Sequence, residues 1–171
     1  MSGTAARRRI TLLVLDVDGV LTDGTVLLLP TGEDVRAIHF HDLDAVARLR
    51  RRGVEVATLS GEDNPGGHRV AQRFAIAESV WGARDKLPAF EQLCRRLGRS
   101  PDEACYVGDA DRDAPALAAA GLGLAPAGAT AAARAAADLV LEASGGRGAV
   151  AEAVSLLERA AFNPPGPEAS P

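Results

Sequence analysis

LLVLDVDGVLTDG, residues 12–24, places an uninterrupted apolar run directly before a cluster of aspartates. Residues 12–15 are typical of a strand in a parallel sheet, because a strand covered on both faces is apolar throughout rather than alternating. Asp16 and Asp18 stand where such a strand ends. Since ligands of open parallel sheets bind beyond the carboxyl ends of the strands, both carboxylates become candidate site residues.

Apolar runs of the same kind alternate along the chain with segments of helical period. Strands are predicted at residues 10–15, 54–59, 104–108, 122–125 and 138–141, and a short apolar run at 79–81 is a candidate for another. Helices are predicted at residues 43–52, 66–74, 86–97, 112–120, 129–136 and 148–160. This βαβ alternation predicts the α/β class, with a Rossmann-like parallel sheet and helices on both of its faces.

Residues 25–40 interrupt the alternation. Two extended stretches, TVLLL and VRAIHF, flank the sequence PTGED, in which proline and glycine favour a turn. We therefore expect a β-hairpin that projects from the sheet soon after the first strand. The single domain is expected over residues 10–161, between a flexible N-terminal tail, 1–9, and a mobile, proline-rich C-terminal tail, 162–171.

Composition narrows the classes of partner. The net charge of −4 gives no reason to expect a nucleic-acid partner. The sequence shows no signal peptide and no apolar stretch near the ~20 residues of a membrane span, so we expect a cytoplasmic protein without a membrane partner. Cys94 and Cys105 lack the spacing of metal ligands and are expected to be small core residues.

Further polar residues fall at the same edge of the predicted sheet. They are Ser60, Lys86, Asp109 and Asp113. Carboxylates crowded in one place need a compensating cation to remain ionised, and Mg²⁺ binds through one or two carboxylates while keeping room for phosphate oxygens. Carboxylates, a lysine, a hydroxyl and a metal together indicate a phosphoryl-transfer site. Each residue alone has a simpler explanation, such as a helix N-cap for Asp109.

The motifs DVDGVLTDG, SG, K and GDxxxD occur in the order typical of the haloacid dehalogenase superfamily, which this chain resembles. Within that superfamily it is similar to the 3-deoxy-D-manno-octulosonate 8-phosphate phosphatase family over residues 10–160. The similarity includes the hairpin TGEDVRAIHFHD, the segment CYVGDADRDAP and the late motif GGRGAV at 145–150. The resemblance implies a fold without a cap domain, which the short spacing between motifs also indicates, and a homotetramer in which hairpins meet around a central axis.

The resemblance also implies a role for each motif residue. Asp16 would be the nucleophile that forms an aspartyl phosphate, and Asp18 the general acid and base. Ser60 and Lys86 would hold the phosphoryl oxygens. Mg²⁺ would be bound by Asp16, the backbone carbonyl of Asp18 and Asp109, with Asp113 in support through water or Lys86.

Substrate contacts are less closely specified by the motifs. The candidates are Gly61, Asp42 and Arg147. The chain departs from the family where Glu62 replaces an arginine, where Asp42-Leu43-Asp44-Ala45 replaces DGxG, and where Ala151 replaces an arginine. These changes remove cationic or open character, so we expect a phosphorylated sugar or related polyol that lacks a sugar-acid carboxylate, or a sugar acid bound differently.

Three other functions are compatible with parts of the pattern. A non-catalytic oligomerisation domain of a sugar-nucleotide pathway is the main alternative to a Mg²⁺-dependent phosphatase of a small sugar, sugar acid or polyol. A response-regulator receiver also has an acidic site at a sheet edge, but it needs neither the second aspartate of DVD nor the hairpin. A phosphomutase would need a cover that excludes water.

Overall fold

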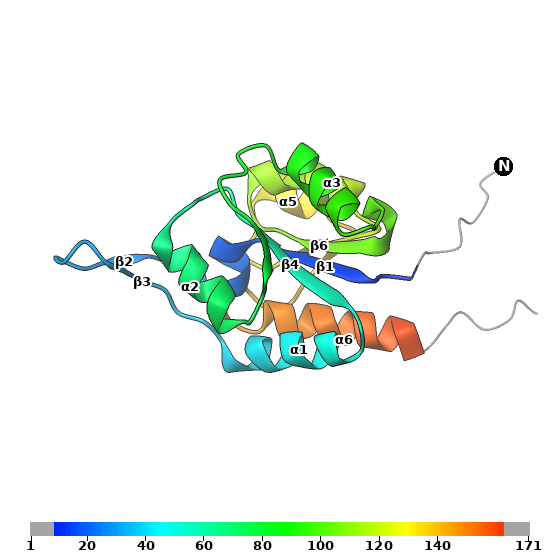
Figure 1. The fold of residues 1–171 in the computed structure, drawn as a ribbon, viewed down its shortest axis with the longest axis horizontal. Helices are drawn as coiled ribbons and strands as arrows, with labels where there is room; N and C mark the ends of the chain where they lie inside the picture. Colours follow the sequence, from blue (N-terminus) through cyan, green and yellow to red (C-terminus); the bar gives the residue numbers. More distant parts are fainter. Residues whose placement is uncertain (1–8, 163–171) are drawn as a thin grey trace, which may run out of the picture.

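The computed structural model describes residues 9–162. Its six-stranded sheet is parallel throughout and has the order β5-β4-β1-β6-β7-β8 (Figure 1). The strands are β1 (Leu12–Leu15), β4 (Glu55–Leu59), β5 (Glu78–Val80), β6 (Ala104–Val107), β7 (Leu122–Ala125) and β8 (Leu139–Val140). The predicted α/β class with a Rossmann-like sheet is confirmed, and the short apolar run near residue 80 does form a strand.

The strand β1 is buried on both faces. Leu13 and Leu15 contact one core, Leu12 and Val14 contact the other, and all four are fully buried. The helices of the first core are α1 (Phe40–Arg51), α2 (Pro65–Arg73) and α6 (Ala149–Phe162). Those of the second, on the opposite side in Figure 1, are α3 (Lys86–Arg96), α4 (Ala114–Ala119) and α5 (Ala131–Ala136). Because burying one such side chain contributes about 1.5–3 kcal/mol, every position of β1 is apolar.

The register of the sheet brings the strand ends together. Leu15 pairs with Thr58 of β4 on one side and with Val107 of β6 on the other. β1 is also the strand at which the strand order reverses, and ligands of such sheets bind at this switch point. After β1 the chain makes a single turn, η1 (Val17–Leu21), and the residues that follow β1, β4 and β6 emerge at one edge.

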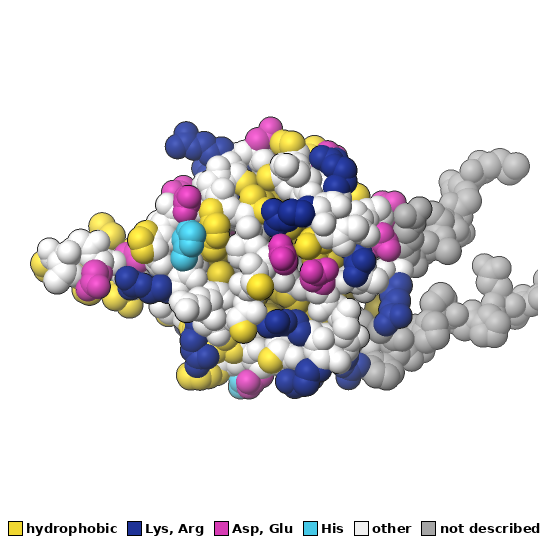
Figure 2. All heavy atoms as spheres, in the orientation of Figure 1, with side chains coloured by type: hydrophobic (Ala, Val, Ile, Leu, Met, Phe, Trp, Pro, Cys, Tyr) yellow, Lys and Arg dark blue, Asp and Glu magenta, His cyan; other side chains and the backbone are white. Residues whose placement is uncertain are grey.

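The projecting hairpin consists of β2 (Leu27–Leu28) and β3 (Asp34–Val35), which pair antiparallel (Figure 1). It is shorter than the two stretches suggested, because Ile38 instead bridges to Thr22 and Phe40 already begins α1. Leu28 is 83% exposed, and Figure 2 shows several exposed hydrophobic side chains on the projecting end, together with acidic ones. The described chain therefore carries an apolar hairpin surface that its own domain leaves open.

The connections leave no room for a cap domain within the described residues. β2, β3 and α1 fill the connection from β1 to β4, and α2 and β5 fill the one from β4 to α3. Two short turns, η2 (Pro101–Glu103) and η3 (Asp111–Asp113), precede β6 and α4. None of the described helices is long and apolar enough to cross a membrane. The predicted tails lie outside the described residues, apart from their innermost residues, 9 and 162.

Candidate active site

Lys86 and Asp16 form the centre of the site. Lys86 is the first residue of α3 and only 1% exposed, and its Nζ donates to Asp16 Oδ1 at 2.9 Å and to the Leu59 carbonyl at 2.7 Å. The same Nζ lies 3.1 Å from Asp113 Oδ1. An ammonium has three donors, and here they face two carboxylates and one carbonyl. The position of Lys86 and the orientation of Asp16 are therefore set together.

Asp113 is the buried carboxylate on the other side of the Lys86 contact. It is fully buried, its Oδ1 accepts from the Tyr106 hydroxyl at 2.7 Å, and its Oδ2 accepts from the Ala110 N–H at 3.0 Å. The same Oδ1 lies 3.1 Å from Lys86 Nζ, and the carboxylate is also near those of Asp16 and Asp109. Both supporting roles expected for Asp113 therefore stay predictions.

Asp109 follows β6 and faces the turn after β1. Its Oδ1 is buried and has no hydrogen-bond partner among the described residues. Gly19 makes the approach of this carboxylate possible, because a Cβ at position 19 would overlap Asp109, and because its φ of +89° disfavours other residues. The carboxylate is thus held against the backbone that links Asp18 to Gly19, with an oxygen left for a ligand.

The site carries more negative charge than its one lysine balances. One carboxylate oxygen from each of Asp16, Asp109 and Asp113 lies within 4.8 Å of the others. Burial raises the pKa of Asp16 to about 7, although Lys86 acts in the opposite direction. Burial and the Asp113 carboxylate raise the pKa of Asp109 to about 6. An unpartnered buried oxygen and an unbalanced charge are the surroundings that a hard divalent cation fits, so these residues fit Mg²⁺.

The segment after β4 forms the side wall. Ser60 is 3% exposed, and its Oγ accepts from the Glu62 N–H at 3.1 Å. A Cβ at Gly61 would lie 2.7 Å from Nη1 of Arg112, so this guanidinium covers the Gly61 backbone. Arg112 was not among the residues expected at the site. Its place between the aspartates of GDADRD was the available signal.

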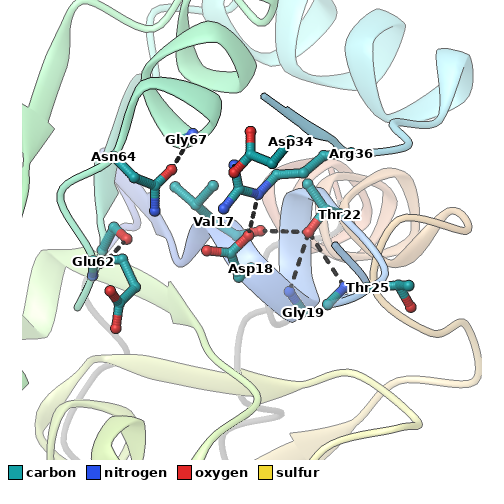
Figure 3. A network of polar contacts seen from close by, with 12 residues as sticks. Val17, Asp18, Gly19, Thr22, Thr25, Asp34, Arg36, Glu62, Asn64 and Gly67 are labelled. Carbon is teal, nitrogen blue, oxygen red and sulfur yellow. Dashed lines mark hydrogen bonds and ion pairs between the residues drawn. The ribbon is translucent and has the colours of Figure 1, made fainter. Parts of the chain in front are cut away.

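Asp18 is held from the hairpin side. Arg36 Nε donates to Asp18 Oδ1 at 2.9 Å, and Arg36 Nη1 donates to Asp34 Oδ2 at 2.8 Å (Figure 3). The Arg36 side chain is only 6% exposed, although it follows a projecting strand. Sequence reasoning did not identify Arg36, because its partner Asp18 is far from it along the chain.

The structure contradicts the substrate contact predicted for Asp42. This residue of α1 is fully buried, and its carboxylate accepts from the Gly148 N–H at 3.3 Å and the Ala151 N–H at 2.8 Å. These are orphan donors at the start of α6, so Asp42 caps that helix from a neighbouring one. Burial raises the pKa of Asp42, against the two hydrogen bonds.

Arg147 lies on the side of the site that Gly19 and Asp109 border. It lines a cavity of about 340 Å³ together with Gly19, Asp23 and Asp109, and its Nη2 lies 3.7 Å from Asp23 Oδ2. The glycine before it also matters, since a Cβ at Gly145 would overlap the Gly19 carbonyl. The late glycine motif thus supports the turn after β1 while leaving Arg147 exposed to the cavity.

Comparison with known proteins agrees with this geometry. Residues 39–121 match the family model of haloacid dehalogenase-like hydrolases. The 3-deoxy-D-manno-octulosonate 8-phosphate phosphatase of Haemophilus influenzae is 34% identical over 148 residues, which cover 86% of this chain and 82% of that protein. The chain belongs to this phosphatase family. It is accordingly a phosphoric monoester hydrolase of the haloacid dehalogenase superfamily, as the order of the motifs predicted. The Escherichia coli K12 member of the family is 35% identical over 153 residues, 90% of this chain and 81% of that protein.

Solved structures of the family share the fold. The Moraxella catarrhalis phosphatase, in complex with a magnesium ion, a phosphate ion and a KDO molecule, superposes with a TM-score of 0.86 at 30% identity and covers 91% of this chain and 89% of its own. A haloacid dehalogenase family hydrolase from Streptomyces avermitilis gives a TM-score of 0.81 at 33% identity, with coverage of 90% and 93%. The prediction of a fold without a cap domain is confirmed.

Proposed function

We propose that this chain is a Mg²⁺-dependent phosphatase that hydrolyses a small phosphorylated sugar, sugar acid or related polyol through an aspartyl phosphate on Asp16. The observation that carries the proposal is the pairing of Asp16 with Lys86 at 2.9 Å beside the unpartnered Asp109 oxygen. A nucleophilic carboxylate, a fixed cation and an open ligand position for a metal are then in one place. Asp16 and Asp109, with the backbone carbonyl of Asp18, would hold Mg²⁺, which would offset the charge of the phosphoryl group.

In the first half of the reaction, a carboxylate oxygen of Asp16 attacks phosphorus, and the bond from phosphorus to the sugar oxygen breaks. Asp18 gives its proton to that leaving oxygen, so the sugar departs as a neutral alcohol. Ser60 and Lys86 hold the equatorial phosphoryl oxygens, and Lys86 does so by redirecting one of the three donors that face Asp16, Asp113 and the Leu59 carbonyl.

In the second half, a water molecule attacks the aspartyl phosphate. Asp18, now a carboxylate, takes a proton from this water, and the bond between phosphorus and Asp16 breaks. Inorganic phosphate leaves, while Asp16 and the protonated Asp18 are regenerated. The two displacements at phosphorus thus use one residue, Asp18, first as an acid and then as a base.

The walls of the site bear on the substrate class. The relatives are named for 3-deoxy-D-manno-octulosonate 8-phosphate, a sugar-acid phosphate. Of the three departures from the family, Leu43 and Ala151 pack against the core, whereas Glu62 is exposed directly after Ser60 and Gly61. Glu62 would repel a substrate carboxylate, which supports a neutral sugar or polyol phosphate. Gly61 and Arg147 remain the proposed substrate contacts.

The first experiment is phosphate release from a panel of sugar, sugar-acid, cyclitol and nucleoside monophosphates, with Mg²⁺ and with EDTA, for the wild type and Asp16→Asn. Metal-dependent release that Asp16→Asn abolishes is the expected result. If 3-deoxy-D-manno-octulosonate 8-phosphate has the highest kcat/KM of the panel, the proposed exclusion of a sugar-acid carboxylate is wrong.

The exposed hairpin supports a second proposal, that the protein is a homotetramer. Leu27 and Leu28 are 61% and 83% exposed, and Val35, which pairs with Leu27, is exposed as well. An apolar surface on a projecting element is characteristic of a protein contact. If the panel gave no phosphate release while the tetramer formed, a non-catalytic assembly role would replace the phosphatase.

A further inference from the structure

We propose that Arg36 is a positioning residue: its guanidinium, brought in by the hairpin, fixes the carboxylate of Asp18 for proton transfer to and from the leaving oxygen. This inference rests on the proposed function, because it assigns Asp18 the proton. It adds a residue outside the four motifs, and it makes the placement of the hairpin a condition for protonating the leaving group.

The contacts of Arg36 define one geometry. Its Nε donates to Asp18 Oδ1 at 2.9 Å and its Nη1 to Asp34 Oδ2 at 2.8 Å, so carboxylates hold the guanidinium from two sides (Figure 3). With 6% of its side chain exposed, Arg36 is among the more buried charges of the described chain. Losing one of these ion pairs would leave a buried charge without a partner, which is unfavourable. Arg36 is therefore expected to keep both contacts.

The neighbouring helix is shaped to admit this side chain. A Cβ at Gly66, in the first turn of α2, would overlap Arg36 Nη1 and Asp34 Oδ1. Gly66 itself is buried. Glycine is unfavourable inside a helix, so its presence here accords with the close approach of the Asp34–Arg36 pair. This observation is independent of the hydrogen bonds themselves.

The backbone and the side chain of Asp18 are held by different residues. The Thr22 Oγ1 accepts from the N–H groups of Gly19 and Gly24 at 3.4 and 3.3 Å, which closes the turn around Asp18. Within the described part of the chain, Arg36 is the one ion-pair partner of the Asp18 side chain. Because the contact uses Oδ1, Oδ2 would be the oxygen that exchanges the proton.

Loss of Arg36 should therefore lower kcat/KM most for substrates whose leaving group must be protonated by a general acid. A sugar phosphate releases a strongly basic alkoxide unless it is protonated, whereas p-nitrophenyl phosphate releases a stable phenolate. General acid catalysis contributes roughly 10²–10⁴-fold where it is needed. For Arg36→Gln we expect kcat/KM to fall about 10- to 100-fold for the best sugar phosphate and less than about 3-fold for p-nitrophenyl phosphate.

The quantity kcat/KM suits this test because it reports the steps up to release of the alcohol. Arg36→Lys should restore part of the loss, since an ammonium can still pair with Asp18. Gly66→Ala should reproduce the selective loss by displacing Arg36 without altering its charge. Arg48→Gln is the matched control, because Arg48 pairs with Glu158 at 2.9 Å between α1 and α6, away from the site.

The outcomes separate the two proposals. Equal losses on both esters, or no loss on either, for an Arg36→Gln protein that unfolds at the wild-type temperature would overturn the role of Arg36 while leaving the phosphatase intact. Failure of the wild type to hydrolyse either ester would overturn the proposed function, and the role of Asp18 and Arg36 with it. A selective loss that Arg48→Gln does not show would establish the positioning role.

Discussion

The ammonium of Lys86 lies 2.9 Å from Oδ1 of Asp16, although 70 positions separate the two residues in the chain. A buried cation that is already in place can offset the phosphoryl charge as that charge develops. Lys86→Met is expected to lower kcat by about 10²–10³-fold, the effect of removing one such donor. Steady-state kinetics at saturating Mg²⁺ would measure it. Wild-type kcat for Lys86→Met would contradict the assignment.

The raised pKa values of Asp16 and Asp109 connect stability, pH and metal. The metal-free folded protein binds protons that the unfolded chain has lost, so its stability should fall as pH rises from about 4 through the folded pKa values near 6 and 7. A bound cation stabilises the ionised carboxylates and so opposes this loss of stability at high pH. At 100 times its Kd, Mg²⁺ should add about 2.7 kcal/mol to the free energy of unfolding.

Thermal unfolding at pH 5 and pH 8, with Mg²⁺ and with EDTA, would check this coupling. The stabilisation by Mg²⁺ should be larger at pH 8, because protons compete with the metal at pH 5. In Asp109→Asn the metal effect should largely disappear. A stabilisation of equal size at both pH values would show that the aspartates do not bind the ion.

Asp42 is expected to matter for stability and not for substrate. Asp42→Ala leaves the Gly148 and Ala151 N–H groups without their acceptor, which should cost about 1–3 kcal/mol of unfolding free energy. The exposed neighbour Asp44→Ala is the control, expected to change stability by less than about 0.5 kcal/mol. Urea denaturation would give both values. A rise in KM for a folded Asp42→Ala protein would instead support the original prediction that Asp42 contacts the substrate.

The hairpin surface should determine the oligomeric state. Leu28→Lys places a charge at the most exposed of the hairpin leucines, so the expected tetramer should dissociate. Leu139→Lys, at a 49% exposed leucine of β8, is the matched control and should leave the assembly unchanged. Light scattering at micromolar concentration would measure the mass. A monomeric wild type would end the tetramer proposal.

Glu62 should contribute to the choice of substrate. Glu62→Arg replaces a repulsive charge beside Gly61 with an attractive one, and it is expected to raise kcat/KM for a sugar-acid phosphate about 10-fold relative to a neutral sugar phosphate, which corresponds to about 1.4 kcal/mol. Glu62→Gln should give a smaller change in the same direction. If the ratio of kcat/KM for the sugar-acid phosphate to that for the neutral sugar phosphate is unchanged in both variants, the leaving group binds elsewhere in the site.

Local sequence determined the elements and the motif residues. The apolar run before Asp16 requires a strand covered on both faces, and the helical period of the segments between strands requires crossover helices. Strand ends in a parallel sheet meet at one edge, so Asp16, Ser60 and Asp109 could be placed together from the chain alone. Lys86 could be assigned because its place after the second motif, SG, and before GDxxxD resembles one known family.

Tertiary structure decided which polar side chains belong to the site. Asp42 comes directly after the hairpin, and from this position it was predicted to contact the substrate. It instead caps a helix that begins more than 100 residues later. No local pattern marks Arg36, and Arg112 is marked only by its place between the aspartates of GDADRD. Packing brings these two residues against Asp18 and Gly61. Hydrophobic periodicity acts over a few residues and can be seen in a sequence, whereas the partner of a charge depends on how distant segments dock.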